Sequence, residues 1–165
     1  MLTDPLKNAL EFGFLPGQVV ADFGAGSGHY SLALSKLLGP EGRVYAVDIR
    51  EEPLIRLKKL VEEAGRENLE VLVGDIDEEK GSMLRDSCVD GVVIANLLFQ
   101  LEKPEGAVRE TKRVLKPGGR VCVVEHKDKF ESSKVKEIFL NNGFSLKREI
   151  ALGGGYLGAI FTITH

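Results

Sequence analysis

Short apolar runs alternate with amphipathic stretches along most of the 165-residue chain, and this rhythm limits the possible folds more than any other feature. In the amphipathic stretches, apolar residues recur every three or four positions, as Leu54, Leu57 and Val61 do, which is typical of helices that bury one face. Strands that alternate with such helices form parallel sheets with crossover connections. The sequence therefore predicts an α/β fold, with a doubly wound, mostly parallel seven-stranded sheet and helices on both of its faces. The predicted strands are residues 18–23, 42–49, 70–73, 88–96, 120–125, 144–150 and 159–164.

The last two predicted strands are expected to form an antiparallel pair. The segment between them, residues 151–158, is too short for a crossover helix, whereas antiparallel neighbours need only a short loop. The sheet should therefore carry an antiparallel C-terminal strand. The length of the chain fits a single domain over residues 1–165.

Glycine and proline mark where two predicted helices stop. Gly39-Pro40 follows the first helix, and Lys116-Pro117-Gly118-Gly119 follows the helix that precedes the fifth strand. Proline cannot continue a helix, and glycine supplies the turn. The predicted helices are residues 30–38, 54–64, 104–115 and 135–140.

Composition and charge exclude several classes of protein. Hydrophobic residues make up 43% of the chain, and no apolar run approaches the length of a membrane span, so no membrane partner is expected. The net charge of −3 disfavours a broad basic surface for nucleic acids. Cys88 and Cys122 show neither CxxC spacing nor a flanking histidine cluster, so no metal site or disulfide is indicated. The first residues do not resemble a secretory signal, and a cytoplasmic location is expected.

Glycines crowd the turn at the end of the first predicted strand. The strand ends in Asp22-Phe23-Gly24-Ala25-Gly26-Ser27-Gly28, and a helix follows directly. Glycine lets the backbone turn sharply and approach a ligand without a Cβ in the way, and in open α/β sheets ligands bind at the carboxyl ends of the strands. The Gly-x-Gly-x-x-Gly fingerprint of dinucleotide-binding turns is incomplete, because His29 stands where its third glycine is needed. The match to an NAD site is therefore imperfect.

The spacing Asp-x-Gly-x-Gly-x-Gly resembles the first motif of class I S-adenosylmethionine-dependent methyltransferases. The resemblance extends along the chain: Asp48 ends the second predicted strand, Gly74-Asp75-Ile76 ends the third, and Leu115-Lys116-Pro117-Gly118-Gly119-Arg120 leads into the fifth. It implies a Rossmann-like sheet, S-adenosylmethionine as cofactor and methyl transfer as the activity. Within the family, the chain is similar to the ubiquinone/menaquinone-type and small-molecule methyltransferases.

The resemblance also implies which residues bind the cofactor. Asp22 would face the methionine amino group, and Asp48 would accept both ribose hydroxyls, since one carboxylate can take two hydrogen bonds. Asp75 would accept from the adenine amino group, and Asn96 would reach the methionyl part. The full implied set is Asp22, Gly24, Gly26, Gly28, Asp48, Ile49, Asp75, Ile76 and Asn96.

Each assignment has a structural alternative. For Asp22 and Asp48 it is capping of the helices that follow. Asp75 is followed closely by other acids, so its alternative is ordinary surface charge, and Asn96 is also a typical turn residue. The residues alone leave these alternatives open.

Methyl transfer needs a general base only if the acceptor must lose a proton, because the main task of the enzyme is to hold nucleophile and methyl group close and aligned. His126 is the favoured candidate, since it follows the fifth strand and histidine titrates near neutrality. Its alternative is a solvated loop histidine. The polar residues considered near the strand ends are His29, Tyr30, Glu125, His126 and Asp128.

The acceptor is expected to be a small molecule. The fourth strand runs into Asn96-Leu97-Leu98-Phe99 instead of Asn or Asp followed by Pro-Pro-Tyr, which disfavours methylation of base or glutamine nitrogens. Little sequence is available to cover the acceptor, so a homodimer or a partner protein completing the site is also considered. Two other functions stay open: a catalytically silent cofactor-binding subunit, and a nicotinamide-dependent oxidoreductase, which His29 opposes.

Overall fold

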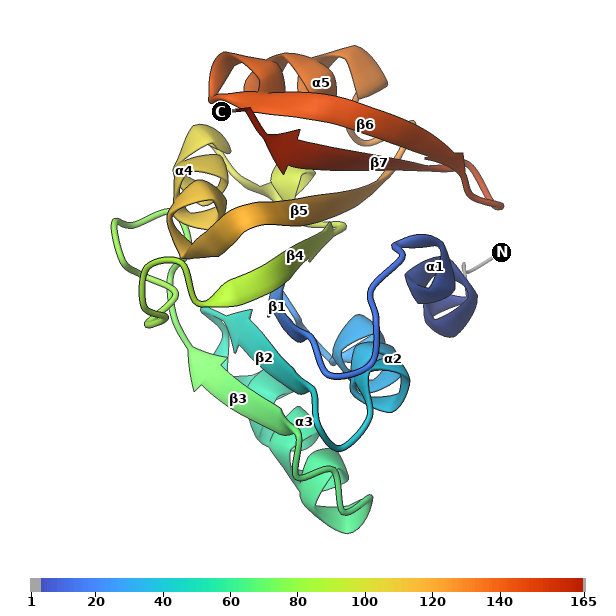
Figure 1. The fold of residues 1–165 in the computed structure, drawn as a ribbon, viewed down its shortest axis with the longest axis vertical. Helices are drawn as coiled ribbons and strands as arrows, with labels where there is room; N and C mark the ends of the chain where they lie inside the picture. The colour runs from blue at the N-terminus through green and yellow to red at the C-terminus, as the bar shows by residue number, and fades with distance from the viewer. Residues whose placement is uncertain (1–3, 165) are drawn as a thin grey trace.

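A computed structural model describes residues 4–164, and its centre is a seven-stranded sheet (Figure 1). The strand order is β3-β2-β1-β4-β5-β7-β6, and all neighbours are parallel except β7, which runs antiparallel to β5 and β6. The strands are β1 (Val19–Phe23), β2 (Arg43–Asp48), β3 (Leu69–Val73), β4 (Val89–Ala95), β5 (Leu115–His126), β6 (Phe144–Ala151) and β7 (Tyr156–Ile163). The predicted fold class is confirmed.

Helices cover both faces of this sheet, and each face has its own apolar core. The helices are α1 (Pro5–Glu11), α2 (His29–Leu38), α3 (Glu51–Glu63), α4 (Glu105–Val114), α5 (Ser132–Asn141) and the short 3₁₀ helix η1 (Leu98–Gln100). α1, α2 and α3 share one core, in which Phe12 is fully buried. α4 and α5 share the other, where the rings of Phe139 and Phe161 stack with centroids 4.5 Å apart. Between residues 4 and 164, no helix is both long and apolar enough to span a bilayer.

The central strands are buried from both sides. Val92 and Val93 are neighbours in β4, belong to opposite cores, and are both fully buried. This double burial explains the almost continuous apolar run of β4. The strand order reverses direction between β1 and β4, and such a reversal leaves a crevice at the carboxyl ends of the two strands.

The N-terminal helix α1 was not predicted, although its start has a recognisable signal. The Asp4 carboxylate accepts hydrogen bonds from the backbone N–H groups of Leu6 and Lys7, and Pro5 occupies the first turn. An acidic N-cap followed by proline is typical of helix starts. Asn8 of α1 donates to the Tyr30 hydroxyl of α2 over 2.9 Å, which ties the two helices together.

Two strands begin three or more residues before their predicted starts, namely β5 and β7. Leu115 already pairs with Val89, so β5 begins five residues earlier than predicted, and residues 116–119 form an irregularity inside the strand. β7 begins at Tyr156, because its pairing with β5 continues as far as His126. The loop between β6 and β7 is therefore residues 152–155, shorter than expected.

Candidate functional site

A pocket of about 380 Å³ lies at the carboxyl ends of β1 and β4. Its volume lies in the range of small-molecule sites. Four of the predicted site residues line it together, namely Asp22, Gly24, Gly26 and Asn96. The full lining is Pro5, Asp22, Gly24, Ala25, Gly26, Ser27, His29, Tyr30, Arg50, Ala95, Asn96, Gln100 and Tyr156.

The glycine turn between β1 and α2 holds its shape through its own hydrogen bonds. Gly24, Gly26 and Gly28 all have positive φ, at +73°, +54° and +81°, a region that glycine enters without strain. The Gly24 N–H donates to the Val47 carbonyl over 2.8 Å, the Gly26 N–H to an Asp48 carboxylate oxygen over 2.8 Å, and the Gly28 N–H to a carbonyl within the turn. These N–H groups are therefore engaged within the protein, whereas a pyrophosphate site needs such groups free to donate.

Asp22 is a buried acid at the floor of the turn. Its side chain accepts a 2.6 Å hydrogen bond from the Ser31 hydroxyl at the start of α2. Burial raises the pKa of the Asp22 carboxyl to about 7; the Ser31 hydrogen bond acts against this rise, and the charge of Asp48 adds to it. A cationic ligand group beside Asp22 would favour its ionised form.

Asp48, at the end of β2, is ionised, and its carboxylate already accepts several hydrogen bonds within the protein. Its carboxylate accepts from the Gly26 N–H, from the Arg50 N–H at 2.9 Å, and from the Arg50 side chain at 3.2 Å (Nε) and 3.4 Å (Nη2). Burial acts to raise the pKa of Asp48, but the hydrogen bonds from Arg50 and Gly26 outweigh it and leave the pKa below its ordinary value. The Arg50 side chain thus occupies oxygens that a ligand hydroxyl would need.

The loop after β4, residues 96–100 and here called the β4 loop, forms one wall of the pocket. Asn96 has φ +55°, a left-handed conformation in which asparagine is favoured among residues with a side chain. Its carbonyl accepts from Gln100 Nε2 over 2.6 Å. Leu97 packs over the glycine turn so closely that a Cβ on Gly24 would lie 2.7 Å from Leu97 Cδ1. The β4 loop and the glycine turn therefore hold each other in place.

Five predicted cofactor-binding residues do not line the pocket. Gly28 and Asp48 belong to the glycine turn and its hydrogen bonds, and the other three lie elsewhere. Asp75 follows β3 and accepts from the Asp77 N–H over 3.1 Å. Ile76 is buried in the core beneath α4 and α5. Ile49, just after β2, is 60% exposed, and Val73, at the end of neighbouring β3, is 50% exposed.

His126, the predicted general base, is also absent from the pocket lining. Its Nδ1 accepts from the Asp128 N–H over 3.2 Å, and its ring packs edge-on against Tyr156 with centroids 4.9 Å apart. Tyr156 itself lines the pocket. The role of His126 as a base stays a prediction, and the ring of Tyr156 links it to the pocket lining.

The sequence indicated the segment 153–156, which ends in Tyr156, as one that could shape the acceptor site, but it did not reveal Pro5, Arg50 or Gln100. Pro5 had a signal in the helix start that follows Asp4. Arg50 and Gln100 had no signal in the sequence. Each reaches the pocket because its side chain folds back onto an earlier residue, Arg50 onto Asp48 and Gln100 onto Asn96. Tyr156 is the first residue of β7, which begins earlier than predicted.

Residues 15–153 match the family described as "Methyltransferase domain". The chain is 34% identical over 109 residues to an arsenite methyltransferase of Halobacterium salinarum, covering 66% of this chain and 27% of that protein. It is 34% identical over 122 residues to a demethylmenaquinone methyltransferase of Lactococcus lactis, covering 72% and 46%. The chain thus spans less than half the length of these relatives. The crystal structure of a SAM-dependent methyltransferase from Aquifex aeolicus is similar with a TM-score of 0.88 and 30% identity, covering 99% of this chain and 91% of that one.

Proposed function

Because the chain belongs to the S-adenosylmethionine-dependent methyltransferases, we propose that it transfers a methyl group from that cofactor to a small-molecule acceptor. When bound, the cofactor supplies a methyl group on a positively charged sulfur, which an acceptor attacks in line as the carbon–sulfur bond breaks. The contribution of the protein is to hold the two partners close and aligned.

The glycine turn is the observation that carries this proposal. It presents open backbone and the buried Asp22 carboxyl to the pocket, while the N–H groups of Gly24, Gly26 and Gly28 are engaged within the protein. Such a turn fits a ligand with a cationic amino group and no phosphate. It does not fit the pyrophosphate of a nicotinamide cofactor.

The other predicted contacts follow from this placement. Asp22 would hold the amino group of the cofactor, and Asp48 its ribose hydroxyls. The exposed side chains of Ile49 and Val73 lie at the ends of adjacent strands, where an adenine ring would cover them, and Asp75 would accept from its amino group. These assignments form part of the proposal.

Uncharged and aromatic side chains near the pocket favour a small acceptor. Tyr30, Gln100 and Tyr156 line it, and His126, packed against Tyr156, is the proposed base for an acceptor that must lose a proton. The two cysteines are not among the lining residues, which argues against an acceptor captured by thiols, such as arsenite. A second subunit or partner protein completing the site stays a prediction.

Calorimetric titration with S-adenosylmethionine, S-adenosylhomocysteine and NAD tests the proposal. We expect both sulfur ligands to bind at micromolar concentration and NAD not to bind. Asp48→Ala should weaken the sulfur ligands about tenfold or more, because a charged hydrogen-bond acceptor is lost. Failure of both sulfur ligands to bind would refute the proposal, and binding of NAD alone would favour an oxidoreductase. Turnover with a panel of acceptors then separates an enzyme from a silent cofactor-binding subunit.

Arg50→Ala is expected to strengthen cofactor binding. The Arg50 side chain, 59% exposed, competes for the oxygens of the buried Asp48. An ion pair whose cation lies in solvent is worth about 1 kcal/mol, so affinity should rise about fivefold. The gain should be larger for the sulfonium ligand than for S-adenosylhomocysteine, because a nearby positive charge is removed. Calorimetry measures both, and weaker binding would show instead that Arg50 itself contacts the ligand.

A further inference from the structure

Glu125 is a buried acid that the proposed chemistry does not use. It lies near the end of β5, and its side chain is only 2% exposed. Its Oε1 atom accepts two backbone hydrogen bonds, from the Leu98 N–H at 2.7 Å and from the Leu97 N–H at 3.1 Å. Within residues 4–164, its other oxygen, Oε2, is buried and has no hydrogen-bond partner.

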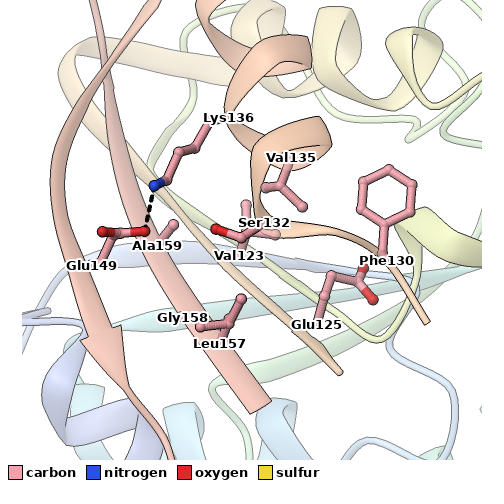
Figure 2. A pocket seen from close by; sticks show the side chains of 10 residues that line it. All are labelled: Val123, Glu125, Phe130, Ser132, Val135, Lys136, Glu149, Leu157, Gly158 and Ala159. Atoms are coloured by element: carbon pink, nitrogen blue, oxygen red, sulfur yellow. Dashed lines mark ion pairs between the residues drawn. The ribbon is translucent and has the colours of Figure 1, made fainter. Parts of the chain in front are cut away.

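Among residues 4–164, no cation forms an ion pair with Glu125. It lines a cavity of about 10 Å³ between α5 and the sheet, whose walls include Val123 and Phe130 (Figure 2). This volume is roughly what one water molecule needs. The charged side chains at the cavity, Lys136 and Glu149, pair with each other over 2.6 Å on the side away from Glu125, as Figure 2 shows. Accordingly, burial raises the pKa of Glu125 to about 7, although its two backbone hydrogen bonds act to lower it.

A second buried glutamate shows what compensation looks like in this fold. Glu110 in α4 accepts from the backbone N–H groups of Lys80 and Ser82, in the loop after β3. It also pairs with Arg113, and although burial acts to raise its pKa, the hydrogen bonds from Arg113 and Ser82 leave it below the ordinary value. Both glutamates hold a loop at the carboxyl end of the sheet, but Glu125 does so without a cation.

The segment that Glu125 holds is the β4 loop. Its two anchored N–H groups belong to Leu97 and Leu98, between the pocket residues Asn96 and Gln100. Leu97 also packs on Gly24 of the glycine turn. Fixing these two N–H groups therefore fixes one wall of the pocket and its contact with the opposite wall.

We propose that Glu125 is the positioning residue of the β4 loop: by accepting the N–H groups of Leu97 and Leu98, it holds Asn96 and Gln100 at the cofactor pocket. It acts from the core side of the sheet, through the backbone, without touching the ligand. The part of this inference that concerns the ligand rests on the proposed function, whereas the anchoring itself does not.

Amide hydrogen exchange of Leu97 and Leu98 tests the anchoring without any ligand. In Glu125→Ala both amides should exchange at least about tenfold faster, because two bonds to an acidic side chain are lost. Glu125→Asp withdraws the carboxylate by one methylene and should have the same effect, which gives a second test if the alanine variant does not fold. Glu125→Gln keeps an acceptor in place and should stay within about threefold of the wild type. Wild-type protection in a folded Ala or Asp variant would overturn the proposal, as would a Gln variant as unprotected as Ala.

Titration of the same variants with S-adenosylhomocysteine tests the link to the pocket. Affinity should fall about tenfold or more in Glu125→Ala and Glu125→Asp and be largely retained in Glu125→Gln. Unchanged affinity in an Ala variant with unprotected amides would overturn the positioning role. If the wild type itself does not bind, the proposed function fails, while the exchange data still decide whether Glu125 anchors the loop.

The pH profile provides a readout that a merely space-filling side chain would not change. Opening the loop would hydrate Glu125 and return its pKa from about 7 towards its ordinary 4.5. Opening should therefore become easier as pH rises between these values, after correction for intrinsic exchange rates. Glu125→Gln should abolish this dependence. Asp22→Asn, which removes another carboxyl with a pKa of about 7, should retain it. A flat wild-type profile would overturn the role of the Glu125 carboxyl.

Discussion

Replacing Asp22 by asparagine is expected to stabilise the ligand-free protein above pH 7 and, in the same variant, to weaken cofactor binding about 100-fold. Asparagine keeps an oxygen for the Ser31 hydroxyl but carries no charge that burial would penalise. The pKa of Asp22 rises from 3.8 to about 7 on folding, which corresponds to a cost of up to about 4 kcal/mol once the carboxyl is ionised.

The pH window of this gain follows from the same shift. Between pH 4 and 7 the folded state binds more protons at Asp22 than the unfolded state does, so wild-type stability falls as pH rises through this window. Below about pH 4, Asp22 is neutral in both states, and the variant and wild type should have similar stability. Glu125, whose pKa burial also raises to about 7, adds a fall of the same sign that the variant keeps.

Binding should depend on pH in the opposite direction. The ionised Asp22 is the form that holds an amino group, so wild-type affinity for S-adenosylhomocysteine should fall as pH drops below 7, and Asp22→Asn should bind about 100-fold more weakly at pH 8. Urea denaturation from pH 4 to 8 and calorimetry at pH 6 and 8 measure the two effects. A variant that kept both the wild-type stability profile and the wild-type affinity would show that Asp22 is not the charged anchor of the pocket.

Gly28→Ala is expected to destabilise the fold by about 3–4 kcal/mol, more than a left-handed backbone alone explains. Gly28 is the N-cap of α2 with φ +81°, and a Cβ there would lie 2.3 Å from Leu57 Cδ1 of α3. Leu57 is fully buried and cannot move away without disturbing its core. The variant therefore adds an overpacked contact between two helices to the backbone strain.

Gly65→Ala is the matched control for this effect. Gly65 follows the end of α3 with a positive φ of +62°, and the Arg66 N–H donates to the Val61 carbonyl, as at a left-handed helix end. A Cβ at Gly65 would meet nothing within 4 Å. Its cost should be the backbone strain alone, about 1–2 kcal/mol. Urea denaturation of both variants measures the difference, and equal losses would rule out the contact with Leu57 as the cause.

The fold was predictable because its signals repeat along the chain. Apolar runs that are buried on both faces, such as β4, look different in sequence from amphipathic helices, and seven strands were located from this contrast. The ends of the strands were harder to predict, because pairing with a neighbouring strand sets them. Leu115, for example, belongs to β5 through its pairing with Val89, although the pairing becomes regular again only at Arg120. That residues 1–165 form one domain stays a prediction.

The candidate site was predictable where its chemistry lies at strand ends. The acids and glycines after β1 and β2 meet because the carboxyl ends of parallel strands share one edge. Glu125 shows the limit of this reasoning. It stands beside His126 in sequence and was considered as a base with it, yet alternation along β5 turns the Glu125 side chain into the core with Val123. Only the packing of the β4 loop above it reveals what that carboxyl holds.

The left-handed backbone of Asn96 limits which residues can replace it during evolution. A φ of +55° suits glycine, asparagine and aspartate, and the loop is held there by main-chain groups: the Asn96 N–H donates to Val124, and its carbonyl accepts from Gln100. Exchange among these three residues would leave the turn intact, whereas a β-branched residue would break it. The shape of the turn alone therefore permits all three residues, so the Asn96 amide, at the edge of the pocket, can be exchanged without loss of the turn.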